Sequence, residues 1–255
     1  MRIEALGTSG GLGEGRRTTS LWLPEDRALL DAGTGAGELP PAAMESLRRV
    51  FLTHAHLDHC AALPFLAGAV AGRPGPPLVV HGLETSLATV GEKLFTGDIW
   101  PDFRRLPTPA KPALAFADLA PGDSLQLDEC AIVALPARHA IPAVGYAVVG
   151  PRRTAAFTGD TGPCPELMAA LEALPRLEIL VVETSFPNAD AERAATTGHY
   201  TPASLAQDLA RLRRRPELLL THFKPGAEET LAAEAAAALS GWTWRPLAAG
   251  DAIEL

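Results

Sequence analysis

Short apolar runs alternate with amphipathic stretches along most of the chain. At the start, the apolar segments RIEALGT, TSLWLP and ALLDAGT are separated by Gly-rich or charged turns, which predicts β-structure. Strand-like and helix-like segments then take turns, and several of the later strand-like segments end in polar residues. The pattern predicts an α/β (α+β) protein built from layers of sheet and helix.

One segment departs from this pattern. Residues 97–123, GDIWPDFRRLPTPAKPALAFADLAPGD, are rich in proline and show little periodicity. The segment is too long for an ordinary connection and not polar enough for simple disorder. We expect an insertion, or a lid over a site. Since no linker separates two parts of the chain, residues 1–255 are expected to form a single domain.

The charge balance limits the class of partner. The formal net charge is −8 at pH 7, which argues against a protein that binds long nucleic acid, because such binding depends on Lys and Arg contacts to phosphates. The one basic cluster, RLRRRP at 211–216, falls in the predicted last turns of a helix over 201–215, where cations suit the helix dipole. A small-molecule substrate is more compatible with this negative net charge. The sequence leaves open whether the chain forms a homodimer.

The sequence carries no sign of a membrane or a secretory context. No apolar run reaches the roughly 18 residues that cross a bilayer, and the start MRIEALGTSGG lacks signal-peptide features. We therefore expect no membrane partner and a cytoplasmic location. Cys60, Cys130 and Cys164 are widely separated without a CxxC, so neither a disulfide framework nor a thiolate zinc site is encoded.

The stretch FLTHAHLDHC at 51–60 holds three of the seven histidines of the chain. A spacing of two places His54 and His56 on the same side of an extended backbone, so they can share a metal. Asp58 and His59 follow at the start of a helix, where they can reach a second metal. Imidazole and carboxylate suit Zn²⁺, Mn²⁺ or Fe²⁺, and the lack of suitably placed Cys ligands favours an open, catalytic site over a structural zinc.

Three further residues support this site. His139 in ALPARHAI, Asp160 in AAFTGDT and His222 in ELLLTHF each end a hydrophobic strand, so all three can converge at one edge of a sheet. Taken singly, each is more often a cap or turn residue. Their joint occurrence indicates a shared metal site.

The order HAHLDH, a further His, TGD and a final His in THF is similar to the metallo-β-lactamase superfamily, and the resemblance covers nearly the whole chain. It implies an αββα sandwich with a dinuclear site at one sheet edge that holds two divalent metal ions, Zn in the first place and Mn or Fe as alternatives. Two metals about 3.5 to 4 Å apart can hold a hydroxide at neutral pH and clamp a scissile phosphoryl or acyl group. The implied ligands are His54, His56 and His139 for the first metal, Asp58, His59 and His222 for the second, and Asp160 as the bridge.

Two residues outside the ligand set indicate the kind of bond that is cut. A phosphodiester loses an alkoxide, which needs a proton from a general acid. His199 in TTGHYTP lies on a turn just before the helix that Thr201 caps and Pro202 opens. Glu183, at the end of EILVVETSF, can orient this imidazole and raise its pKa. A loop histidine with a structural hydrogen bond and a solvated strand-end carboxylate remain the alternatives.

The segments EALGTSGG, LLDAGTG, FTGDTGP, VVETSFPN and TGHYTPASL sharpen the resemblance to the class II cyclic-nucleotide phosphodiesterases. Leu57 favours this branch, because the tRNA 3′-end endonucleases of the superfamily typically carry Gly there, and no Gly-rich basic arm for tRNA is evident. The chain departs from the class II pattern at Cys60, Ala62 and Leu66. These departures put in doubt its place among the cyclic-nucleotide enzymes but leave the metal motif intact.

Candidate substrate contacts are fewer. In IWPDF, Trp100 or Phe103 could stack on a purine, and Asp102 could accept a hydrogen bond from an exocyclic amine. The alternative is that both aromatic residues anchor the long loop in the core. Gly10 and Gly11 in TSGG could bring backbone N–H groups to a phosphate.

The leading hypothesis is a dinuclear metal hydrolase that cleaves 3′,5′-cyclic nucleotides, cAMP or cGMP. In it, a metal-bound hydroxide that Asp58 helps to position attacks phosphorus, and His199 protonates the departing 3′ oxygen. The second hypothesis is a phosphodiesterase of RNA ends or of another small phosphodiester. The third is a metal-binding protein without hydrolytic activity.

Overall fold

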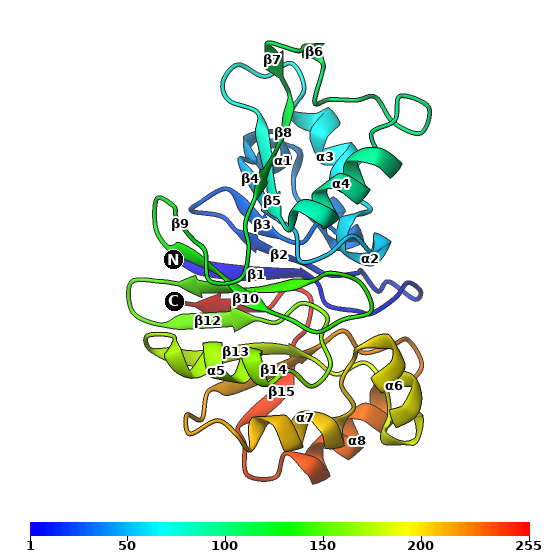
Figure 1. The fold of residues 1–255 in the computed structure, drawn as a ribbon, viewed down its shortest axis with the longest axis vertical. Helices are drawn as coiled ribbons and strands as arrows, with labels where there is room; N and C mark the ends of the chain where they lie inside the picture. Colours follow the sequence, from blue (N-terminus) through cyan, green and yellow to red (C-terminus); the bar gives the residue numbers. More distant parts are fainter.

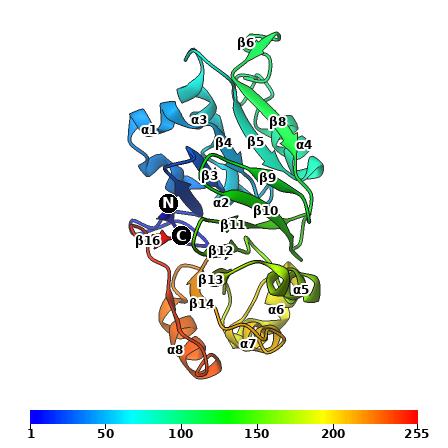
Figure 2. The same ribbon diagram turned by 90° about the vertical axis from the view of Figure 1, so that its left-hand side faces the viewer.

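The computed structural model describes residues 1–255 and consists of two seven-stranded sheets packed face to face, with helices on both outer faces (Figure 1). The view turned by 90° shows the same order of layers, with the chain termini close together beside the junction of the sheets (Figure 2). The predicted αββα sandwich is confirmed. None of the helices is both long enough and apolar enough to cross a lipid bilayer.

The first sheet has the order β16–β1–β2–β3–β4–β5–β8, and the second has the order β15–β14–β13–β12–β11–β10–β9. The strands of the first sheet are β1 Arg2–Gly7, β2 Ser20–Leu23, β3 Ala28–Leu30, β4 Arg49–Phe51, β5 Leu78–Gly82, β8 Leu114–Asp118 and β16 Ala252–Glu254. Those of the second are β9 Ser124–Gln126, β10 Ala131–Pro136, β11 Val144–Val149, β12 Thr154–Phe157, β13 Leu177–Glu183, β14 Glu217–Thr221 and β15 Trp244–Pro246. A small separate hairpin pairs β6 Pro107–Thr108 with β7 Lys111–Pro112.

The helices divide between the two outer faces. On the first sheet lie α1 Pro41–Ser46, α2 Leu57–Cys60, α3 Leu63–Val70 and α4 Glu84–Lys93, together with the 3₁₀ helix η1 Thr34–Glu38. The second half of the chain contributes α5 Pro165–Ala173, α6 Ala191–Thr197, α7 Pro202–Leu209, α8 Glu228–Ala238 and the 3₁₀ helix η2 Asn188–Asp190, of which α5, α7 and α8 pack on the second sheet.

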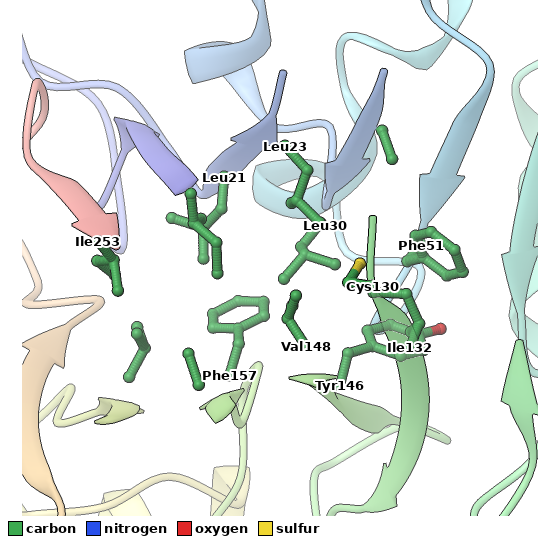
Figure 3. Close-up of a cluster of buried hydrophobic side chains, with 14 of the residues drawn as sticks. Leu21, Leu23, Leu30, Phe51, Cys130, Ile132, Tyr146, Val148, Phe157 and Ile253 are labelled. Carbon is green, nitrogen blue, oxygen red and sulfur yellow. The ribbon is translucent and has the colours of Figure 1, made fainter. Parts of the chain in front are cut away.

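The central core lies between the two sheets. Figure 3 shows side chains from both sheets facing each other across this layer, among them Leu30 and Phe51 from the first and Val148 and Tyr146 from the second. Each fully buried apolar side chain of this kind contributes about 1.5–3 kcal/mol to folding. The hydroxyl of Tyr146 donates to the Leu52 carbonyl oxygen at 2.9 Å, so its polar end is satisfied inside the core. This layer fixes the two sheets relative to each other. It therefore also fixes the loops at the sheet edges that carry the candidate site residues.

Two predicted elements differ from the structure. Within residues 97–123, residues 114–118 form β8, which pairs in parallel with β5 as the edge strand of the first sheet. The β6–β7 hairpin projects at the far end of the molecule, well away from α2 in both views, so this part of the segment is an extension of the sheet edge rather than a lid (Figures 1 and 2). The prolines interrupt the alternation of apolar and polar residues, so the sequence pattern did not indicate this short strand.

The basic cluster is the second difference. Helix α7 ends at Leu209, so RLRRRP at 211–216 lies beyond its last turn. The backbone N–H groups of Arg213 and Arg214 donate to Glu172 Oε1 at 2.6 and 3.2 Å, which takes the chain out of the helix. The guanidinium of Arg215 lies over the Trp242 ring at 4.3 Å. The Arg211 and Arg213 side chains stay exposed, at 60% and 92%.

Candidate metal centre

The segments that follow β4, β10, β12 and β14 meet at one edge of the sandwich and bring all seven predicted ligands together. The ligands form two groups in which the ligand atoms lie within 4.8 Å of one another. We call His54, His56, His139 and Asp160 the first cluster. The second cluster is Asp58, His59, Asp160 and His222. The division between the two clusters is the one expected from the sequence.

In the first cluster, three imidazole nitrogens converge. His56 Nδ1 lies 3.0 Å from His54 Nε2 and 3.2 Å from His139 Nε2. The opposite nitrogen of His139, Nδ1, donates to the Gly198 carbonyl oxygen at 3.0 Å, which leaves a lone pair on Nε2. Burial lowers the pKa of His54 well below its usual value, and the neighbouring His59 adds to this shift. Neutral imidazoles whose lone pairs face one another fit a cation between them.

In the second cluster, His59 Nε2 and His222 Nε2 lie 3.3 Å apart. Asp58 Oδ2 is 3.2 Å from His222 Nε2. Burial lowers the pKa of His59, but the charges of Asp160 and Asp31 outweigh it and raise this pKa well above its usual value. Without a metal, a proton on His59 supplies positive charge at this place, and a bound metal would displace that proton.

Asp160 links the two clusters. Its Oδ1 lies 3.3 Å from both His59 Nε2 and His222 Nε2, and its Oδ2 lies 3.8 Å from His54 Nε2. The residue is buried, yet Oδ1 has no hydrogen-bond partner. A buried carboxylate oxygen of this kind is costly unless a cation fills its place. The donor set therefore fits two divalent ions with Asp160 between them.

Asp31 is a residue of the site that the sequence analysis missed. It is fully buried, and its Oδ2 accepts from His59 Nδ1 at 2.7 Å and from the Thr53 hydroxyl at 2.8 Å. Its Oδ1 accepts from the Thr53 backbone N–H at 2.7 Å. A carboxylate on the far nitrogen of a ligand histidine fixes the ring and its tautomer. The available signal was an aspartate placed directly after the buried strand β3, in LLDAGT.

His199 and Glu183 form a pair beside the two clusters. His199 Nδ1 donates to Glu183 Oε1 at 2.7 Å, and Glu183 is fully buried. Burial lowers the pKa of His199, but the charge of Glu183 and this hydrogen bond outweigh it and raise the pKa. The His199 ring lies 4.8 Å from that of His139 and 5.6 Å from that of His222, measured between ring centres. The His199 imidazole thus lies next to both clusters, and its Nδ1 is already bonded to Glu183.

The local sequence explains why His199 is placed there. Helix α6 ends at Thr197 and is capped by Gly198, whose φ of 69° is left-handed and suits glycine. A Cβ on Gly198 would lie 2.7 Å from the Cα of His139. The close approach of His139 to the backbone beside His199 therefore requires glycine. Helix α7 then begins with a capping box between Thr201 and Ser204, as expected for the start of a helix.

The predicted substrate contacts lie in two places. Trp100 and Phe103 are partly buried and pack against the core beneath the first sheet, where the Trp100 ring lies 5.0 Å from the exposed Phe65 ring. The carboxylate of Asp102 accepts from the Arg104 guanidinium at 2.8 and 3.1 Å. Each residue thus has a partner within the protein, and contacts with a base stay a prediction.

Gly10 lies directly beside the second cluster. A Cβ on Gly10 would lie 2.6 Å from the His222 carbonyl oxygen and 2.9 Å from His222 Nδ1. Its backbone N–H donates to the Phe223 carbonyl oxygen at 3.1 Å and is not free to bind a phosphate. The role that the structure indicates for Gly10 is to leave room for the predicted ligand His222, whereas a phosphate contact from Gly11 stays a prediction.

Comparison with known proteins assigns this chain to a family. The model of the beta-lactamase superfamily domain matches residues 26–223. Ribonuclease Z of Thermobifida fusca is 28% identical over an alignment that covers 76% of this chain and 74% of that protein. Ribonuclease Z of Synechococcus sp. strain WH7803 is 29% identical over an alignment that covers 88% of this chain and 85% of that protein. The structure of unliganded yeast PDE1 superposes with a TM-score of 0.82 at 16% identity, covers 100% of this chain and 99% of that one, and shows the same fold. The chain therefore belongs to the family that this model describes, the beta-lactamase superfamily domain.

Proposed function

We propose that this protein is a metal-dependent phosphodiesterase. The observation that carries the proposal is the His199–Glu183 pair, held at 2.7 Å over the two ligand clusters. A metal hydrolase that cleaves a bond with a good leaving group has little need of a second proton donor. A phosphodiester, by contrast, releases an alkoxide that must be protonated.

The residues divide the work as follows. Two divalent ions in the clusters would supply Lewis-acid activation of water and of the phosphoryl oxygens. The Asp58 side chain is 27% exposed, so its carboxylate faces the open side of the second cluster and can orient a nucleophilic water there. His199 donates its Nε2 proton to the leaving oxygen, while Glu183 holds Nδ1 and stabilises the imidazolium form.

For the substrate, we place a phosphodiester at an RNA end first. This assignment is supported by the two curated relatives, both named ribonuclease Z, whose matches extend over most of this chain and most of their own length. The contact would be with a few nucleotides near the cleaved bond. The net charge of −8 offers little electrostatic attraction for a long polyanion.

A 3′,5′-cyclic nucleotide is the second candidate, and the charge balance favours it. In the basic cluster at 211–215, Arg211 pairs with Asp208 at 3.1 Å, while the Arg213 side chain stays 92% exposed. Leu57, between His56 and Asp58 in the chain, is 63% exposed, so a substrate can contact it and it can act on substrate choice. A small substrate needs no extended basic surface.

The test is a panel of three substrates with the zinc- or manganese-loaded protein: bis(p-nitrophenyl) phosphate, cAMP, and a short RNA with a 3′ extension. We expect turnover of the nitrophenyl ester and site-directed cleavage of the RNA. Turnover of cAMP without RNA cleavage would move the assignment to the second candidate. If none of the three is hydrolysed by the loaded protein, the phosphodiesterase assignment is wrong.

A further inference from the structure

The hydroxyl of Ser185 lies at the centre of a hydrogen-bond network that joins the ligand His222 to His199. Ser185 follows β13 and is fully buried. Its Oγ lies 2.9 Å from Glu183 Oε2, 2.9 Å from His222 Nδ1 and 3.1 Å from His199 Nδ1. Its backbone N–H also donates to Glu183 Oε2, at 3.0 Å, so the position of the hydroxyl is fixed.

Counting protons assigns the direction of each bond. A serine hydroxyl has one proton to donate and two lone pairs to accept. The Glu183 carboxylate can only accept, so Ser185 donates to it. The Ser185 oxygen must then accept from Nδ1–H of His222, which leaves the lone pair of His222 on Nε2, facing Asp58 and His59. His199 has a shorter acceptor of its own, Glu183 Oε1 at 2.7 Å.

We propose that Ser185 is a positioning residue that makes His222 a ligand of the second cluster and couples that cluster to His199 through Glu183. Without the hydroxyl, nothing at this place holds the proton on His222 Nδ1. The ring is then free to rotate or to take the tautomer with its proton on Nε2, the nitrogen that faces the metal position. Partners of this kind on ligand histidines are worth about 10–100-fold in metal affinity.

The same hydroxyl also bears on His199. It saturates Glu183 Oε2, so that Oε1 stays directed at His199 Nδ1. Loss of the hydroxyl leaves Glu183 held, apart from its bond with His199, by backbone groups, among them the N–H of Thr161 at 3.1 Å and of Tyr200 at 3.3 Å. We therefore expect a loosened proton donor as well as a weakened metal position. This second effect rests on the proposed phosphodiesterase function, whereas the effect on metal binding does not.

The neighbouring residue supplies a matched control. Thr184 is also fully buried, but its hydroxyl has no hydrogen-bond partner. Thr184→Val removes a buried hydroxyl of the same strand end and keeps the shape of the side chain. It should leave both the metal affinity and the leaving-group dependence unchanged.

The experiment measures zinc bound per chain and the affinities of the two positions by competition with a chelator. We expect Ser185→Ala to weaken one of the two positions by about 10–100-fold, and Thr184→Val to bind as the wild type does. In a His222→Ala background, Ser185→Ala should have little further effect, because the two residues act as a unit. Wild-type affinity of both positions in Ser185→Ala, or an equal loss in Thr184→Val, overturns the proposal.

A kinetic readout separates this inference from the proposed function. At saturating zinc, Ser185→Ala should lose about 10-fold more activity on a phosphodiester with an alkyl leaving group than on the nitrophenyl ester. An equal loss on both esters overturns the coupling to His199. If the wild type hydrolyses neither ester while Ser185→Ala still loses one zinc position, the proposed function is wrong and the role in metal binding stands.

Discussion

Asp31 gives the sharpest test of how the ligand set is held, because one atom of its side chain can be changed without changing its shape. In Asp31→Asn, one carboxylate oxygen becomes an NH₂ group. The Thr53 backbone N–H lies 2.7 Å from Oδ1 and can only donate, so the amide oxygen must take that position. The NH₂ group then faces His59 Nδ1, 2.7 Å from the present Oδ2.

Two donors cannot share this contact, so His59 must give up its Nδ1 proton and carry one on Nε2. That nitrogen is the one directed at the second cluster. We expect the affinity of the second metal position to fall by about 10–100-fold. At a fixed zinc concentration well above the dissociation constants, this removes about 1.4–2.7 kcal/mol of stabilisation by zinc. For a chain of this size, the unfolding temperature in zinc should drop by about 3–11 °C.

Thermal unfolding with and without zinc measures the drop in unfolding temperature, and chelator competition measures the loss of affinity at the second metal position. Asp26→Asn is the matched control. Asp26 is also buried, and its carboxylate accepts from the Glu129 backbone N–H at 2.9 Å and from Cys130 Sγ at 3.4 Å, on the core side and apart from the ligand clusters. It should lower stability equally with and without zinc. If Asp31→Asn binds two zinc ions as tightly as the wild type, the assigned role of Asp31 in fixing the His59 tautomer is refuted.

Three further outcomes test the site. His199→Ala should slow hydrolysis of an alkyl phosphodiester by about 100- to 10,000-fold and that of a nitrophenyl ester far less, and equal losses in steady-state assays would remove His199 from the acid role. Gly10→Ala should weaken zinc binding in calorimetric titrations, because its Cβ would meet His222 at 2.6 Å, whereas Gly37→Ala, with open space around it, should not. Removal of zinc with a chelator should lower the unfolding temperature and re-addition should restore it; unchanged melting curves would contradict a metal centre at the clusters.

Much of the architecture and the predicted ligand set was accessible from the sequence for one physical reason. Ligands at the carboxyl ends of strands stand out, since a polar residue that ends an apolar run has no place in the core. The strand pattern also predicted layers of sheet and helix, whereas the two-sheet αββα sandwich was implied by the resemblance to the metallo-β-lactamase superfamily. Asp160 and His222 are predictable in this sense even though the residues that they meet lie far away in the chain.

The supporting residues were less accessible because their roles depend on tertiary contacts. Asp31 and Ser185 are an ordinary turn aspartate and an ordinary loop serine by local pattern, and only packing brings them to His59 and His222. Helix α7 likewise ends at Leu209, before the turn whose Arg213 and Arg214 N–H groups donate to Glu172, a contact that local helix preference does not encode. Sequence pattern thus indicates which residues can bind a metal, and the fold determines what holds them.

The site uses one arrangement twice for two different purposes. In His59 and in His199, a buried carboxylate accepts the Nδ1 proton at 2.7 Å. The difference lies on the other nitrogen. Nε2 of His59 is sealed among His222 and Asp160, with 1% of the side chain exposed, so a metal is the partner that fits it. The His199 side chain is 8% exposed, and its Nε2 has no partner in the protein. The same carboxylate–histidine pair therefore favours a ligand role for His59, whose ring meets the other predicted ligands, and under the proposed function it would favour a proton-donor role for His199, whose Nε2 is left without a protein partner.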